Sequence, residues 1–244
     1  PALGQRTDEE HVADIARRMQ GVPDLFRTTN RLLVKEWDIP RKPTAKGVRV
    51  GLPRALEFWS SMPLWTTFLR TLGYEPVISR ASDTSLFADG LPSVPSDTIC
   101  FPAKLVHGHV LDLVAKKVDR ILMPQLVSLP SDHEAFRANA VCPVIQGYPI
   151  VVRNGDDPAG RYGVALDTPM FHWSDWTLAR SQVVQWFSEH WELGPREVGE
   201  AFDAGLSALR AFRRTLQDEG RAVLEQVRSE GKFAVVLAGR PYHS

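Results

Sequence analysis

The sequence predicts an α/β fold built on a parallel sheet with flanking helices. Short β-branched runs alternate with helical stretches along most of the chain. The first strand, helix and strand fit within about 30 residues, the size of a right-handed βαβ unit. Hydrophobic residues make up 43% of the 244 positions and charged residues 24%, which is typical of a globular protein with a substantial core.

The N-terminal segment differs from the rest of the chain in its pattern of residues, which predicts helices and no strands. Residues 8–20 combine an acidic first turn with apolar residues at helical spacing and predict a helix, and residues 24–37 predict a second one. The stretch Pro40–Gly47 is basic and interrupted by prolines, which favours a connector. We therefore expect residues 1–46 to form a helical linker or N-terminal extension.

The central part of the chain carries the alternation of strands and helices. Val48–Leu52 and Glu75–Ser79 predict strands, and residues 55–72 predict a helix that Pro63 should break or kink. Further strands are expected at 97–101, 120–123 and 143–146, with a helix at 103–117. Together these elements predict a Rossmann-like α/β lobe over residues 47–153.

The C-terminal part reads as mainly helical. Residues 154–232 predict a helical region with long helices at 175–191 and 195–230. Its tryptophans fall at near-helical spacing and predict packing contacts: Trp173, Trp176, Trp186 and Trp191. Residues 233–239 have the pattern of a buried strand, so 233–244 predict the first strand of a second, truncated α/β lobe. Both chain ends look cut, and we expect a longer protein around them.

Composition excludes several classes of protein. The 29 basic and 29 acidic side chains cancel, which argues against a general nucleic-acid binder. No apolar run approaches the roughly 20 residues of a membrane-spanning helix, and the polar N-terminus is not a signal peptide. Two cysteines form neither a secreted disulfide framework nor, by themselves, a thiolate-only metal site.

Those two cysteines are nevertheless the main candidates for chemistry. Cys100 falls at a predicted strand end directly before a helix, where the helix N-terminus would stabilise a thiolate. Cys142 falls at the mouth of the next predicted strand, so the two thiols could meet above one sheet edge. Lys104 would add positive potential beside Cys100. The alternative for both cysteines is a buried structural thiol.

Three further side chains are candidates of lower specificity. His107 and His109 are two residues apart on one predicted helix, so they point to different faces and cannot bind one metal together from a straight helix, although Gly108 could loosen the helix there. At least one of them is expected to be a core histidine. Arg240 follows the last predicted strand and could anchor a phosphate or carboxylate. No glycine-rich phosphate loop occurs in the sequence.

Several stretches resemble one known family. They are Val50-Gly-Leu-Pro-Arg-Ala-Leu-Glu-Phe-Trp59, Cys100-Phe-Pro-Ala-Lys-Leu-Val-His-Gly-His109, Val141-Cys-Pro143 with Gly147-Tyr-Pro149, and Val236-Leu-Ala-Gly-Arg-Pro-Tyr-His243. Together they resemble the acyl-CoA dehydratase activase-related proteins, whose large members are similar to activators of 2-hydroxyglutaryl-CoA dehydratase and benzoyl-CoA reductase. The resemblance runs from about Leu25 to the last residue.

The resemblance implies a low-potential redox role in the cytoplasm of anaerobic bacteria. Relatives pair an ATPase activase module with a domain similar to dehydratase subunits, in which cysteines on separate lobes hold a [4Fe–4S] cluster. Cys100 and Cys142 match the family's cysteine positions, and Lys104, His107 and His109 match their companions. The ATPase module itself is not recognisable here, so nucleotide hydrolysis is not expected of this segment.

The favoured hypothesis is therefore an iron–sulfur electron-transfer domain that holds part of a [4Fe–4S] site through Cys100 and Cys142. A further ligand would come from beyond residue 244 or from a partner chain, with an activase module and a dehydratase or reductase as partners. The competing hypothesis is a catalytically silent module that docks an acyl-CoA or a partner protein through Arg54, Lys104 and Arg240. A thiol enzyme using Cys100 with His107 or His109 is a third, weaker possibility, since no orienting carboxylate stands at a readable spacing.

Overall fold

The computed structural model describes residues 13–14, 17, 21–39, 43–130, 140–236, 239–240 and 242. The helix predicted at 8–20 therefore lies mostly outside the described residues. The second predicted helix is confirmed as α2 (Leu25–Leu33), which Asp24 caps by accepting hydrogen bonds from the N–H groups of Phe26 and Arg27.

A parallel sheet forms the centre of the described fold, as the sequence predicts. Its strand order is β2-β1-β3-β5. The strands are β1 (Arg49–Leu52), β2 (Glu75–Ile78), β3 (Arg120–Leu122) and β5 (Ala165–Asp167). Because β1 connects to β2 on one side while β3 lies on its other side, the sheet has a topological switch point between β1 and β3.

A second, two-stranded parallel sheet extends the first. It consists of β4 (Gln125–Ser128) and β6 (Met170–His172), which follow β3 and β5 after only a few residues. Pro124 and Pro169 stand at the two junctions, and a proline has no N–H with which to continue a strand ladder. The N–H of Met123 still donates to the carbonyl of Asp167, at 2.8 Å, so the two sheets remain connected.

Helices cover both faces of the main sheet. Helix α3 (Phe58–Thr71) joins β1 to β2 and runs on through Pro63, so, of the break or kink predicted there, the break is wrong. The chain then forms α4 (Thr84–Gly90), a 3-10 turn (Leu91–Ser93) and α5 (Phe101–Ala115) before it enters β3. Helix α5 lies on the face to which Gly51 points, where Leu113 fills the space beside that glycine.

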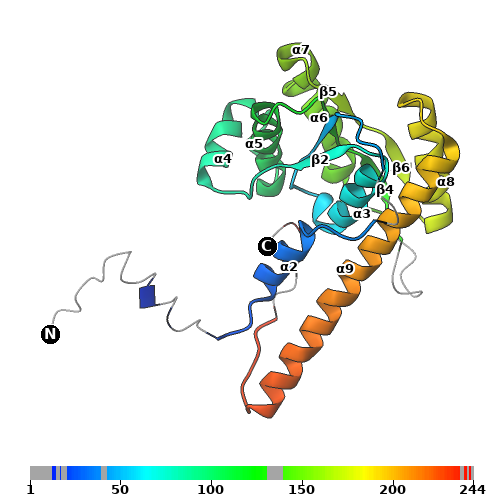
Figure 1. The fold of residues 1–244 in the computed structure, drawn as a ribbon. Coiled ribbons are helices and arrows are strands. Elements are labelled where there is room, and N and C mark those ends of the chain that lie inside the picture. Colours follow the sequence, from blue (N-terminus) through cyan, green and yellow to red (C-terminus); the bar gives the residue numbers. More distant parts are fainter. Residues whose placement is uncertain are drawn as a thin grey trace.

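The remaining helices follow β4 and β6 along the chain. They are α6 (Pro143–Gly155), α7 (Pro158–Tyr162), α8 (Trp176–His190) and α9 (Pro195–Ser229). Helices α6 and α7 contact α5. The first half of α9 packs against α3 and α8, and its last turns extend beyond the rest of the fold (Figure 1). None of the helices in the described part of the chain is both long and apolar enough to cross a membrane.

An aromatic cluster forms the core where α3, α8, α9 and β6 meet. Trp65 of α3 packs against Phe171 and Trp173, with ring centroids 6.2 and 5.6 Å away. Trp173 and Trp191 are buried, and Trp176 and Trp186 are partly buried against the same core. The predicted packing role of these tryptophans is confirmed.

Two of the predicted strands are wrong. Asp97–Cys100 forms a largely exposed loop, and an exposed segment lacks the burial that stabilises a strand; helix α5 begins at Phe101. Residues 143–146 are the first turn of α6 instead. Pro143 occupies the first helical position, which suits a proline because its missing N–H would have no partner there.

The C-terminal part also differs from expectation. Strands β5 and β6 lie within residues 154–232, and β5 pairs with β3 of the main sheet. Phe233–Val236 forms no strand and is exposed, with Phe233 88% exposed. The division of the chain at 46, 153 and 232 remains a prediction.

Gly108→Ala should destabilise the protein by about 1 to 3 kcal/mol. Helices α4 and α5 meet backbone to backbone, and a Cβ at Gly108 would lie 2.1 Å from the carbonyl oxygen of Leu86. Thermal unfolding measures the effect, and Gly220→Ala is the control because nothing lies within 4 Å of its added Cβ. Equal melting temperatures for the Gly108 variant and the wild type would contradict this close packing.

Candidate functional site

The candidate site lies at the carboxyl ends of β1 and β4, beside the switch point of the sheet. Here a cavity of about 350 Å³ is lined by the turn after β1, the start of α3, the residues before α6 with its first turn, and the C-terminal residues Arg240 and Tyr242. Its polar lining residues are Glu57, Ser60, Cys142, Arg240 and Tyr242. Ligands of open α/β sheets bind in this position, outside the carboxyl ends of the strands.

Cys142 is the N-cap residue of α6 and is partly buried. Burial raises the pKa of its thiol, but the nearby backbone N–H groups of Val144 and Ile145 and the Arg240 guanidinium outweigh this effect and lower the pKa. The backbone N–H groups and the guanidinium both stabilise the negatively charged thiolate, as expected at a helix N-terminus. The structure therefore brings Arg240 and Cys142 together in a setting suited to a thiolate.

Arg240→Ala should raise the pKa of Cys142 and slow its alkylation severalfold at pH 7, because the thiolate is the reactive form. The measurement is the rate of iodoacetamide labelling, followed residue by residue by mass spectrometry. Cys100 in the same sample is the internal control. An unchanged Cys142 rate would show that Arg240 does not stabilise its thiolate.

Cys100 is the N-cap residue of α5 and is exposed. Its charge is the smallest of three influences that raise the pKa of Tyr148 on α6, after burial and Asp156. Lys104 donates a hydrogen bond to the carbonyl of Asp97 at 2.8 Å. Lys104 therefore fixes the loop that leads into Cys100.

His107 belongs to a buried network that joins α5 to α6. Its Nδ1 lies 2.6 Å from a carboxyl oxygen of Asp156, and its Nε2 lies 2.9 Å from the hydroxyl of Tyr148. All three side chains are buried. The network therefore joins the two helices that have Cys100 and Cys142 as their N-cap residues.

His109 points to a different side of α5, as its spacing from His107 predicts. It is hydrogen-bonded to Ser79 at 2.8 Å and to Ser82 at 3.0 Å. Burial lowers its pKa to about 4, and Arg54, Arg80 and Lys116 contribute to the same direction while Asp112 opposes it. Near neutral pH His109 is uncharged, and both of its ring nitrogens are occupied by protein groups.

Glu57 is a site residue that the sequence reasoning missed. It is only 5% exposed, one carboxyl oxygen accepts a hydrogen bond from Ser61 at 2.6 Å, and the other oxygen has no partner among the described residues. Burial raises its pKa to about 8, against the opposing effect of Ser61. The residue before it, Leu56, has φ of +47°, a costly conformation that is often found at functional sites.

One signal in the sequence could have found Glu57. It is the only acidic residue between the end of β1 and the middle of α3, where its neighbours Leu56 and Phe58 are apolar and buried. A charged residue in an otherwise apolar turn after a strand is a candidate for function. The buried Tyr148 and Asp156, which partner His107, carried no comparable signal.

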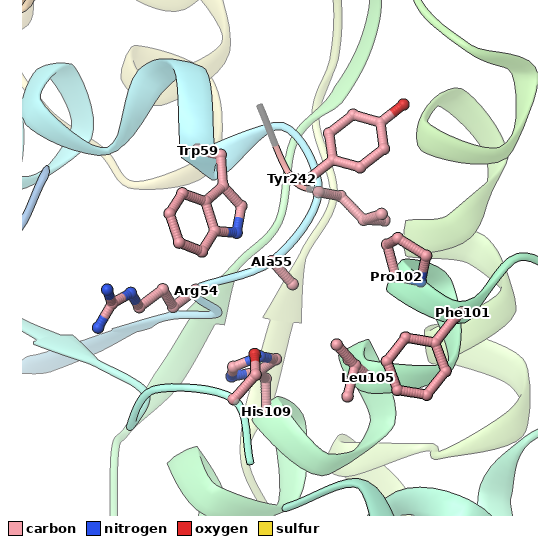
Figure 2. A pocket seen from close by; sticks show the side chains of 10 residues that line it. Arg54, Ala55, Trp59, Phe101, Pro102, Leu105, His109 and Tyr242 are labelled. Atoms are coloured by element: carbon pink, nitrogen blue, oxygen red, sulfur yellow. The ribbon is translucent and has the colours of Figure 1, made fainter. Parts of the chain in front are cut away.

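A second cavity of about 420 Å³ lies beside the first, and Tyr242 lines both. Figure 2 shows the rings of Trp59, Phe101 and Tyr242 around it, whereas the guanidinium of Arg54 points away from Phe101. Arg54 interacts instead with Asn30 and with the ring of Trp59. Docking of a single ligand by Arg54, Lys104 and Arg240 would require all three side chains to line one cavity. They do not line one cavity together.

The structure thus places Cys142, Arg240 and Glu57 at one cavity, with Cys100 at the start of the neighbouring helix. Within the described residues, no group of three or more His, Cys, Asp or Glu side chains is arranged to hold a metal ion. The described part of the chain therefore supplies two thiols and their stabilising environment.

An α/β domain with two thiols at the first turns of adjacent helices is the class that the fold and the site define. A family model described as the CoA enzyme activase uncharacterised domain (DUF2229) matches residues 49–244. The chain belongs to this family. No curated protein and no solved structure matches the chain.

Proposed function

We propose that this domain holds part of a [4Fe–4S] cluster and serves electron transfer in the ATP-dependent reductive activation of a 2-hydroxyacyl-CoA dehydratase-type enzyme. The observation that carries the proposal is the placement of both cysteines as N-cap residues of α5 and α6, two helices that pack together. Membership of a CoA enzyme activase family supports the link to activation.

The two cysteine thiols are ligands of the right chemical kind for such a cluster, but they are fewer than a cluster needs. Thiolates are the usual ligands of iron–sulfur clusters, and sites usually have four of them. Around Cys142, two backbone N–H groups and Arg240 already favour the thiolate form. Hydrogen bonds to ligand sulfurs are one means by which proteins set a cluster's reduction potential. We propose that the remaining ligands come from outside this chain segment.

The bound cluster would supply one-electron chemistry, and the residues of this chain would hold and shield it. Cys100 and Cys142 would act as ligands, Arg240 would offset negative charge, and His107 with Tyr148 and Asp156 would fix the helices that carry the thiols. Glu57 would remain a neutral acid at pH 7 and so add no negative charge to the cavity.

The partners and location follow the same proposal. An ATPase activase module would deliver the electron and a dehydratase or reductase acting on an acyl-CoA would receive it, in the same longer chain or in separate subunits. The location would be cytoplasmic, in an anaerobic bacterium, because low-potential clusters need reducing surroundings.

Anaerobic reconstitution of the full-length protein with iron and sulfide tests the proposal. Visible absorption and electron paramagnetic resonance after reduction should show a [4Fe–4S] cluster in the wild type, and Cys100→Ser or Cys142→Ser should lose most of it. Ser60→Ala is the matched control, since Ser60 lines the same cavity without a thiol. An unchanged cluster in both cysteine variants, or no cluster in the wild type, would contradict the proposal and favour a binding module.

A further inference from the structure

An arginine-lined cleft lies between the start of α8 and the middle of α9, and none of its lining residues lines the cavity at Cys142. The cleft has a volume of about 300 Å³. Arg210, Arg213 and Arg214 line it, together with Gln217 of the same helix and Trp176 at the start of α8. Positions 210, 213, 214 and 217 share one face of a helix, so their side chains reach the cleft together.

This arrangement is unfavourable unless something compensates its charge. Like charges four residues apart, such as Arg210 and Arg214, destabilise a helix. Arg210 and Arg214 are exposed and form no ion pair with a carboxylate within the described part of the chain, whereas Arg213 does have an interaction partner. The same helix pairs other arginines locally, as Arg196 with Glu200 at 2.8 Å and Arg221 with Asp218 at 2.6 Å. The cleft therefore concentrates positive charge in a protein whose total charge is zero.

The chemistry of the lining selects the kind of ligand. Guanidinium groups bind phosphate through pairs of parallel hydrogen bonds, and a cluster of arginines matches an anion of charge −2 or more better than a single carboxylate. Leu206, Leu209 and Trp176 form an apolar wall beside the exposed guanidinium groups of Arg210 and Arg214. The amide of Gln217 adds a hydrogen-bond donor at the end of the row.

We propose that this cleft is a binding site for a phosphorylated small molecule, with Arg210 and Arg214 as its main contacts. The site is separate from the cysteines, so it stands whether or not they hold a cluster. It gives the domain a second, ligand-binding role on the face formed by α8 and α9 (Figure 1).

Calorimetric titration of the full-length protein with pyrophosphate at about 0.15 M salt tests the proposal, because this ionic strength screens loose surface attraction. The wild type should bind pyrophosphate and should not bind acetate measurably. Arg210→Gln combined with Arg214→Gln should weaken pyrophosphate binding about tenfold or more, as expected for lost charge-assisted hydrogen bonds. Arg228→Gln is the matched control: it is exposed on the same helix outside the cleft, and it should bind like the wild type.

The variants should fold, since removing like charges from one helix face relieves repulsion. A melting temperature no lower than that of the wild type confirms this. Arg210→Lys with Arg214→Lys keeps the charge but loses the paired hydrogen bonds, and it should bind with intermediate affinity. The absence of pyrophosphate binding in the wild type, or equal affinity of the wild type and the double glutamine variant, would overturn the proposal.

Discussion

Glu57→Gln should make the protein more stable than the wild type at pH 8 while leaving it nearly unchanged at pH 4. The reason is the pKa of this buried carboxyl, which burial raises from 4.5 to about 8. In the folded state Glu57 holds its proton over this range, whereas in the unfolded chain it releases the proton above about pH 4.5.

The sign of the effect follows from proton linkage. Between pH 4.5 and about 8 the folded state binds more protons than the unfolded state at Glu57, so the free energy of unfolding falls as the pH rises. The slope from this one group is about 1.4 kcal/mol per pH unit, and it vanishes above pH 8. Glutamine has nearly the same shape as glutamate but does not titrate, so the variant does not lose stability as the pH rises. Its side-chain oxygen can still accept the hydrogen bond from Ser61.

Urea unfolding of both proteins from pH 4 to pH 9 measures the difference. The stability gap should open with pH and reach several kcal/mol at pH 8, and the contributions of all other groups cancel in the comparison. Glu225→Gln, at an exposed position of α9, should show no such gap. Parallel pH curves for wild type and Glu57→Gln would mean that Glu57 is not buried as a neutral acid.

His107→Leu should destabilise the protein by about 3 to 5 kcal/mol. The substitution leaves the hydroxyl of Tyr148 and the carboxyl of Asp156 buried without the partner that now lies 2.9 and 2.6 Å away. One oxygen of Asp156 already has no partner among the described residues. Without His107 the other oxygen also loses its partner, and burying an unpaired carboxyl costs free energy.

Denaturant unfolding at constant pH measures this effect. Tyr148→Phe provides the graded comparison, because it removes one hydrogen bond and no ring volume and should lose only about 1 kcal/mol. Both variants loosen the contact of α5 with α6, so reconstituted iron content should fall more in His107→Leu than in Tyr148→Phe. A His107→Leu variant as stable as the wild type would contradict a stabilising role for the network of His107, Tyr148 and Asp156.

The sequence was sufficient for the elements with strong local signals. The parallel pairing of β1 with β2 and the helices α5, α8 and α9 were predicted within a few residues. Short strands were the main failure, because β5 and β6 have three residues each and are separated by Thr168 and Pro169. Such strands exist through their neighbours in the sheet, and a single sequence does not show those neighbours.

The same distinction applies to the candidate site. Cys142 and Arg240 were singled out by residue type, and the structure brings them together, although Cys142 begins a helix where a strand was expected. Glu57 is important because of its burial, and burial comes from the packing of α3 and α6 around the turn after β1. Tertiary contacts of this kind are not readable from spacing along the chain.

The central claim is that Cys100 and Cys142 ligate one cluster, and differential alkylation tests it most directly. Full-length protein reconstituted with iron and sulfide is treated anaerobically with iodoacetamide before and after removal of the iron by a chelator, and each cysteine is then quantified by mass spectrometry. The account predicts that both thiols are protected in the loaded protein and that both are labelled once the iron is removed. Labelling of either Cys100 or Cys142 in protein that retains its full iron content would contradict it.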